Sequence, residues 1–94
     1  MNNFSLDGEV VYLEKIRFTP AGLAVLRLRI KHTSRQKEAS LSKIVNLEIE
    51  SVVIGEFTQE ILTVGDKYLF HGFIEKKSLK SNQNIFHITQ INKK

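Results

Sequence analysis

The stretch from Leu26 to Lys31 alternates strictly between apolar and basic residues. Three apolar residues and three basic ones take turns along it: Leu26, Leu28 and Ile30, and Arg27, Arg29 and Lys31. A period of two predicts a β-strand with one face in an apolar core and the other in water. We expect this strand, residues 23–32, to lie at the centre of the fold. Its row of three cations suits a polyanionic partner.

The composition predicts one small domain, residues 1–94, with 41% hydrophobic residues and a formal net charge of +4. A core of this size often gains stability from oligomerisation. The chain has no cysteine, which suits a reducing cytoplasm. The first residues show no basic-then-apolar signal pattern, and no apolar run is long enough to span a membrane. We therefore expect a soluble, intracellular protein.

Four further segments show strand patterns: residues 3–17, 44–54, 67–75 and 85–91. The first is predicted to be one long strand, bent or closely approached at Gly8. Residues 19–22, Thr-Pro-Ala-Gly, predict a turn.

Three segments lack a strand pattern. Residues 33–42 and 76–84 are polar and are predicted to be loops, and residues 56–62 are predicted to be a helical turn or irregular cover.

Five short strands without a long helix predict an all-β protein in the form of a small closed barrel, which leaves no exposed sheet edge. A five-stranded Greek-key barrel, the OB fold, fits the lengths of the segments, and an SH3-like barrel fits nearly as well on strand count. The long second strand and the polar loop before the last strand favour the OB fold.

Charge is strongly segmented along the chain. Residues 15–43 carry a net +7 and residues 76–94 a net +5, whereas residues 1–14 and 44–75 carry −3 and −5. In an OB fold the two basic tracts meet around one groove, which predicts a lining for a phosphate backbone. The alternative is that these lysines and arginines are simply solvated surface residues.

The candidate nucleic-acid-binding residues come from these tracts and the turn between them: Lys15, Arg17, Phe18, Arg35, Lys43, Lys76, Lys77 and Lys80. Phe18 is a candidate base-stacking residue, because it lies beside Arg17 and outside any strand phase. Core packing is the default for the other aromatic residues, most of which sit in apolar phases. Phe73, opposite in phase to Phe70, could equally serve a subunit interface.

The central cation row has a second interpretation. If the strand 44–54 pairs antiparallel with it, Glu48 and Glu50 face Arg27, Arg29 or Lys31 as cross-strand ion pairs, each worth about 0.2–1 kcal/mol. About one cation of the row would then remain uncompensated.

No pattern in the sequence predicts an enzyme. The three histidines are far apart and no cysteine accompanies them, so a zinc site is not expected. No nucleophile comes with a recognisable base and orienting partner, and no glycine-rich phosphate loop or cofactor motif is present.

Several short motifs together resemble a known family. They are Leu-Asp-Gly at residues 6–8, Thr-Pro-Ala-Gly at 19–22, Ile-Lys-His-Thr-Ser-Arg-Gln-Lys-Glu-Ala at 30–39, Thr-Val-Gly at 63–65 and Gly-Phe-Ile at 72–74. This pattern covers nearly the whole chain and resembles the PriB (primosomal replication protein N) family, relatives of the single-stranded DNA-binding proteins.

The resemblance implies a homodimer of OB folds that binds single-stranded DNA and acts in replication restart with the PriA helicase and helicase-loading proteins. It implies DNA-binding roles for Lys80, with Lys76 and Lys77, and for Arg17. The chain departs from the pattern at Asn46 and Leu41, where some members place aromatic residues. A protein-interaction adaptor with weak DNA binding and an RNA-binding module remain alternative functions.

Overall fold

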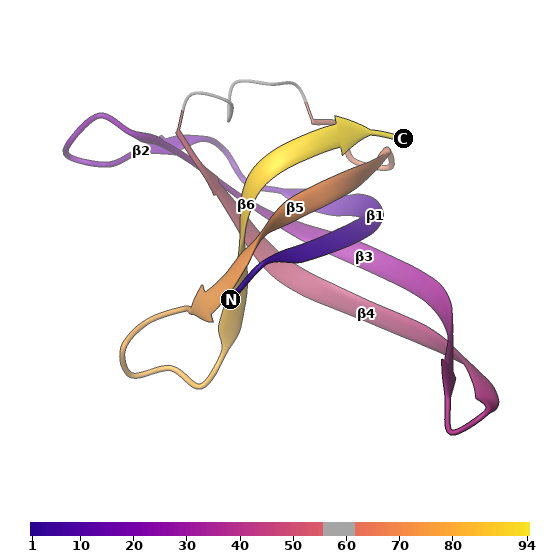
Figure 1. The fold of residues 1–94 in the computed structure, drawn as a ribbon. Helices are drawn as coiled ribbons and strands as arrows, with labels where there is room; N and C mark the ends of the chain where they lie inside the picture. Colours follow the sequence, from indigo (N-terminus) through magenta and orange to yellow (C-terminus); the bar gives the residue numbers. More distant parts are fainter. Residues whose placement is uncertain (56–61) are drawn as a thin grey trace.

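The computed structural model describes residues 1–55 and 62–94 (Figure 1). Its strands are β1 (Phe4–Leu13), β2 (Arg17–Phe18), β3 (Ala24–Glu38), β4 (Leu41–Ile54), β5 (Lys67–Lys76) and β6 (Asn84–Lys93). The helical turn or cover predicted for residues 56–62 falls outside the described residues except for Leu62, which packs against the core.

Five of the strands close into a barrel in the order β1-β5-β6-β4-β3, with β1 pairing back onto β3. All of these pairs are antiparallel except β4 with β6, which is parallel. A parallel pair cannot be joined by a hairpin, so the chain must cross over between these two strands, as a Greek-key barrel requires. The short strand β2 pairs only with β3, at the rim.

The barrel interior is filled by one apolar cluster. Its members come from β1, β3, β4, β5 and β6: Val10, Leu26, Leu28, Ile30, Val53, Tyr68, Phe70, Phe86 and Ile88. The predicted inward phase of the central strand is confirmed, since its three apolar residues are at most 5% exposed. Burial of such side chains contributes about 1.5–3 kcal/mol each.

Two glycines allow neighbouring strands to approach closely. A Cβ on Gly8 would meet the side chain of Ile30 and would lie 2.7 Å from the carbonyl oxygen of Lys31. A Cβ on Gly72 would collide with the backbone of His87 on β6, beside a register shift in β5. The close approach predicted at Gly8 is therefore confirmed.

The loop predicted for residues 33–42 is wrong. The β3–β4 ladder runs without interruption from Val25 opposite Ile54 to Glu38 opposite Leu41. Ala39 and Ser40 make the turn with φ of 52° and 67°, the left-handed backbone of a two-residue hairpin. We call the projecting part of this pair, residues 33–46, the hairpin arm (Figure 1). Its side chains are mostly exposed, so the periodicity that marks a half-buried strand is absent.

The prediction of one long first strand over residues 3–17 is also wrong, because β1 ends at Leu13 and β2 is a separate segment. A register shift between Val10 and Tyr12 breaks the alternation. Val10 is fully buried but Tyr12 is 47% exposed, and Phe4 at the other end of β1 is 50% exposed. Core packing, the default expectation for these aromatic residues, is wrong for Tyr12 and Phe4. The prediction for Phe57 falls outside the described residues.

Candidate nucleic-acid interface

The outer face of β3 and β4 carries the central cation row in the predicted register. Arg29 lies opposite Glu50 and Lys31 opposite Glu48, while Arg27 lies opposite Val52. The facing positions are as predicted, but none of the three cations lies within ion-pairing distance of Glu48 or Glu50, so the predicted cross-strand ion pairs do not form. The carboxylate of Glu50, however, lies 3.0 Å from the Nζ atom of Lys77. This ion pair ties the β5–β6 loop to the strand face.

The segment before β3 contributes three of the predicted site residues. Lys15 and Arg17 are exposed, and Phe18 is 65% exposed. Arg17 pairs across the ladder with Val25, and its guanidinium lies 3.7 Å from the Glu14 carboxylate. Because this pair is largely exposed, it contributes little energy and leaves Arg17 available to another anion. The turn at residues 19–22 is held by a hydrogen bond from the Gly22 amide to the Thr19 carbonyl.

The hairpin arm contributes Arg35 and Lys43, which were predicted in a loop and its flank but lie on β3 and β4. Arg35 faces Ile44 in the ladder. Lys43 is 3.4 Å from the carboxylate of Glu38 near the tip. Both residues are exposed, and the arm carries them away from the barrel wall.

The β5–β6 loop contributes Lys76, Lys77 and Lys80. Lys76 is the last residue of β5, and the amide of Lys77 donates to the carbonyl oxygen of Gln83 across the loop at 2.9 Å. Among the residues that the structure describes, Lys76 and Lys80 have no carboxylate within ion-pairing distance, and the same holds for Lys15 and Arg35. The predicted loop is confirmed for residues 77–83, whereas Lys76 belongs to β5 and Asn84 to β6.

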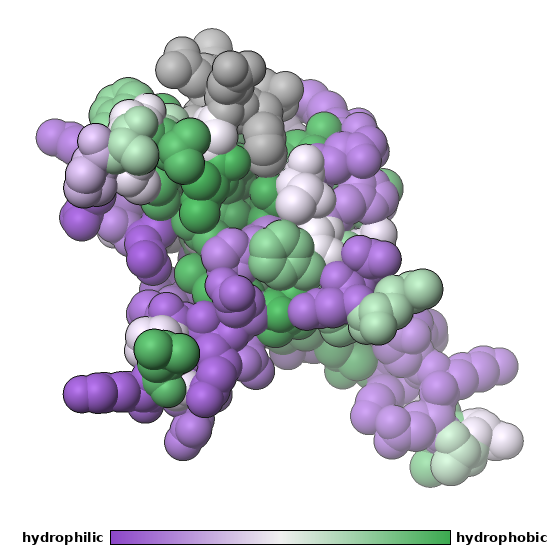
Figure 2. Space-filling view, turned by 60° about the vertical axis from the view of Figure 1, so that its left-hand side comes forward, coloured by the Kyte–Doolittle hydropathy of each residue, from purple (hydrophilic) through white to green (hydrophobic). Residues whose placement is uncertain are grey.

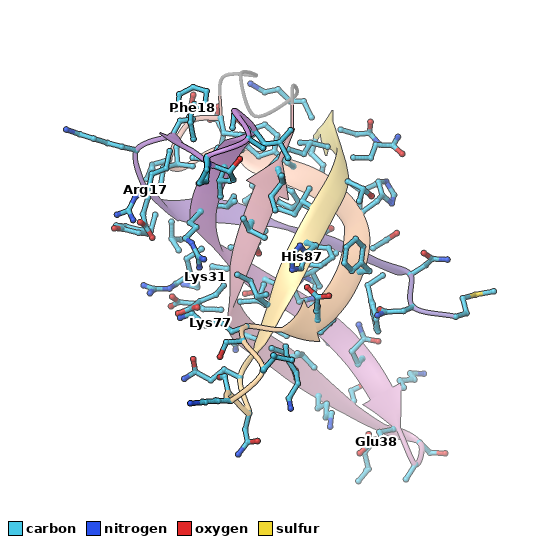
Figure 3. The ribbon with its side chains drawn as sticks, turned by 90° about the vertical axis from the view of Figure 1, so that its left-hand side faces the viewer. Arg17, Phe18, Lys31, Glu38, Lys77 and His87 are labelled. Carbon is cyan, nitrogen blue, oxygen red and sulfur yellow. The ribbon has the colours of Figure 1, made fainter. Side chains whose placement is uncertain are left out.

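Arg17, Lys31 and Lys77 lie along one side of the barrel, and Glu38 marks the tip of the arm (Figure 3). Between the rim and the loop is a shallow cavity of about 80 Å³ whose lining includes Tyr12, Arg27, Arg29 and Lys77. Hydrophilic side chains dominate the lower half of the face shown in Figure 2, whereas apolar ones gather in its upper half.

The structure thus groups the predicted site residues unevenly. Arg17 and Lys77 lie near the cation row, and Arg35 and Lys43 lie out on the arm. Arg27 and Arg29 are not among the candidate residues predicted from the sequence, and core packing is the sequence-based expectation for Tyr12. The sequence predicts about one uncompensated cation in the row without identifying which one, and no sequence signal marks the shift that exposes Tyr12.

Comparison with known proteins identifies the family. The model of a family described as "Another single-strand binding protein family" matches residues 2–90. The replication restart protein PriB of Nitrosomonas europaea is 33% identical over 93% of this chain and 82% of its own length. The chain belongs to the PriB family. PriB of Neisseria meningitidis serogroup C is 34% identical, with 96% of this chain and 91% of that protein covered.

The PriB fold agrees with the barrel described above. The solved three-dimensional structure of PriB from Ralstonia solanacearum matches this chain with a TM-score of 0.87 and 23% sequence identity. The match covers 100% of this chain and 99% of that one. The OB fold is therefore confirmed, and the SH3-like alternative is not.

In this PriB-family chain His32, which is 9% exposed, lies where β3 leaves the barrel. Its Nδ1 atom is 2.7 Å from the carbonyl oxygen of Asp7, which can only accept, so Nδ1 carries the proton. In the neutral ring the Nε2 atom then accepts from the Ser34 hydroxyl at 2.8 Å. A hydrogen bond from Gln36 to Ser34 extends this chain onto the arm.

The Asp7 carboxylate lies 3.2 Å from His32 Nδ1 and 2.5 Å from Lys94 Nζ. The hydrogen bond from Lys94 holds the pKa of Asp7 below its ordinary value, aided by the positive charge of Lys94. Ser34, His32 and Asp7 therefore form a series of contacts through the His32 ring, in which Nδ1 donates to the backbone carbonyl of Asp7 and Nε2 meets the Ser34 hydroxyl. A cavity of about 270 Å³ beside Asp7 includes Thr33 but neither Ser34 nor His32 in its lining. The hydroxyl thus does not face the cavity, and we assign the series a structural role at the base of the arm.

Residues 1–55 and 62–94 contain neither a candidate metal-binding cluster nor a candidate membrane-spanning helix. Within these ranges no three or more His, Cys, Asp or Glu side chains are grouped so that they could hold a metal ion. In the same part of the chain, no helix is long and apolar enough to cross a membrane.

Proposed function

We propose that this protein binds single-stranded DNA without catalysing a reaction, and that it acts in replication restart by bridging the PriA helicase, DNA and the helicase-loading machinery. One observation carries the proposal. Basic side chains from β2, from β3 and from the β5–β6 loop lie along one outer face of an OB-fold barrel. The PriB relatives are named as replication restart proteins, and the family is described as single-strand binding.

Most of the proposed contacts are electrostatic. Seven cations serve the phosphates and one aromatic residue stacks on a base: Lys15, Arg17, Arg35, Lys43, Lys76, Lys77, Lys80 and Phe18. All eight are exposed. Three of the cations lie near an acid, Arg17 near Glu14, Lys43 near Glu38 and Lys77 near Glu50, and a phosphate would have to compete with that acid. The four cations without such a neighbour therefore carry most of the binding.

The test is the salt dependence of affinity for a labelled oligo-dT. Because each phosphate contact on a single strand adds about 0.7 to the slope of log K against log salt, Lys76→Ala with Lys80→Ala lowers the slope by about 1.4. The control is Lys67→Ala with Lys93→Ala, which removes the same charge at the other end of β5 and β6. Absence of binding at low salt, or an affinity that does not change with salt, would falsify the proposal.

A second candidate function is a protein-interaction adaptor whose basic face docks an acidic partner. The three acid neighbours of the cations favour it, because they weaken the field available to DNA. Charge reversal at Lys76, Lys77 and Lys80 discriminates between the two functions. Loss of the helicase contact with DNA affinity unchanged supports the adaptor. A ribo-oligomer that binds more tightly than the deoxy-oligomer of equal length supports an RNA-binding module instead.

We also propose that residues 1–94 act as one domain that forms a homodimer in the cytoplasm. An apolar hollow of about 210 Å³ on the outside of the barrel supports a subunit contact, and its lining includes Val52, Ile54, Phe73 and His87. The rings of Phe73 and His87 are stacked at 4.8 Å, which presents a flat surface. Light scattering gives twice the chain mass of 10.8 kDa if the dimer forms. A species with the mass of a single chain refutes the dimer. A Phe73→Asp variant that still forms the dimer shows that the subunit contact lies elsewhere.

A further inference from the structure

Tyr12 is placed on the outer face by an irregularity of β1. In the β1–β3 ladder Val10 pairs with Ile30, but the next pair is Tyr12 with Arg29, so one residue of β1 is skipped. Strict alternation would place the ring of Tyr12 in the core. The extra residue turns the ring to the outer face instead. The ring is 47% exposed.

Arg29 holds this ring. Its guanidinium carbon lies 5.6 Å from the ring centroid, within the range of a cation–π contact. Such a contact restrains an exposed aromatic side chain before any ligand arrives, which lowers the entropic cost of binding to it.

Two further cations lie at the same place. Tyr12, Arg27, Arg29 and Lys77 share the lining of the cavity of about 80 Å³ with Glu14 and Glu50. Both carboxylates already have partners, since Glu14 lies by Arg17 and Glu50 by Lys77. Within the described ranges, Arg27 and Arg29 have no carboxylate at ion-pairing distance. The cavity therefore combines an aromatic face with two cations, Arg27 and Arg29, whose charge no carboxylate of the described residues neutralises.

The other exposed aromatic residues of the described chain lack this combination. Phe73 is stacked on His87, and Phe4 lies at the end of β1 that pairs with β5. Phe18 is exposed on the short strand β2, outside the cavity.

We propose that Tyr12 is a base-stacking residue, which takes one nucleobase of a single-stranded oligonucleotide while Arg27 and Arg29 contact the adjoining phosphates. The inference rests on the proposed function and adds a site to it. The ligand is a nucleobase on a phosphodiester chain, and recognition by stacking tolerates any base.

The chain provides a direct optical test. It contains two tyrosines and no tryptophan, and Tyr68 is only 4% exposed. Oligo-dT is added to the full-length protein while tyrosine emission and the anisotropy of a labelled oligomer are recorded together. We expect the emission to be quenched as the oligomer binds. In Tyr12→Phe we expect the quenching to disappear and the affinity to stay within about twofold, because phenylalanine also stacks.

Tyr12→Ala is expected to weaken binding about five- to 150-fold at an unchanged salt slope, because a stacking contact releases no counterions. Lys77→Ala, by contrast, lowers the slope. Phe4→Ala is the matched control, an equally exposed aromatic residue on the same strand, and it leaves the affinity unchanged. Circular dichroism establishes that the variants are folded.

The outcomes separate the inference from the proposed function. Tight binding without tyrosine quenching, or with Tyr12→Ala at wild-type affinity, overturns the role of Tyr12 and leaves the proposed function standing. Absence of any binding to oligo-dT at low salt overturns both.

Discussion

The strand pair β3–β4 has two halves that are built by the same ladder but stabilised differently. In the barrel half, β3 residues alternate between buried and exposed from Ala24 to His32. In the hairpin arm nearly every side chain of both strands is exposed, yet the cross-strand pairing continues to Glu38 opposite Leu41. Alternation in a sequence therefore reports burial on one face. It does not report the presence of a strand, because an anchored ladder can extend into water on backbone hydrogen bonds and a short turn.

The largest expected effect compares the same substitution in the two halves. Ile30 is fully buried in the barrel half and Ile44 is 63% exposed on the arm. Ile30→Ala should lower the free energy of unfolding by about 2–5 kcal/mol, because it leaves a cavity in the core. Ile44→Ala should change it by less than about 0.5 kcal/mol. Urea titration of both variants measures the difference. Equal losses would mean that the arm is packed against something in solution.

A smaller effect is expected at the turn of the arm. Ala39 and Ser40 hold left-handed backbone angles that asparagine and glycine adopt more readily. Ala39→Asn with Ser40→Gly should stabilise the arm by about 1 kcal/mol. Amide hydrogen exchange measures this gain locally, and we expect slower exchange at arm residues with core amides unchanged. Exchange that is unchanged or faster in the arm would contradict the left-handed turn.

The smallest effect concerns the junction between the halves. The pKa of Asp7 is lowered in the folded protein, so its contribution to stability is present above its ordinary value of 3.8 and is lost as the pH falls through the lowered value. Asp7→Asn should lower stability by a fraction of a kcal/mol at neutral pH, since the carboxylate is 39% exposed.

The difference from wild type should vanish in acid, which thermal unfolding from pH 2 to 7 measures. Glu48→Gln, which removes an exposed carboxylate on the face of β4, is the control. A difference that grows in acid would mean that folding raises the pKa of Asp7 instead of lowering it.

The barrel half was predictable because burial leaves a period of two, and the opposition of Glu48 and Glu50 to the cation row follows from register alone. The arm was not predictable, since solvent on both faces removes the period. The exposure of Tyr12 was not predictable either, because a one-residue shift in pairing leaves no composition signal. The candidate basic residues were found by charge segmentation, but their acid neighbours depend on loop positions, such as that of Lys77 beside Glu50.

The N-terminal segment contacts β5, a strand that comes late in the sequence. The side chain of Asn2 donates to the Ile74 carbonyl and accepts from the Ile74 amide, 72 positions away, and Phe4 pairs with Gly72. Contacts this distant must close a long loop before they stabilise anything, which makes folding slow compared with a helical domain of equal length. During synthesis on the ribosome, β1 cannot find β5 until most of the chain has emerged. The barrel therefore cannot close over its apolar core until translation is nearly complete, although β1, β2, β3 and β4 can pair with one another earlier.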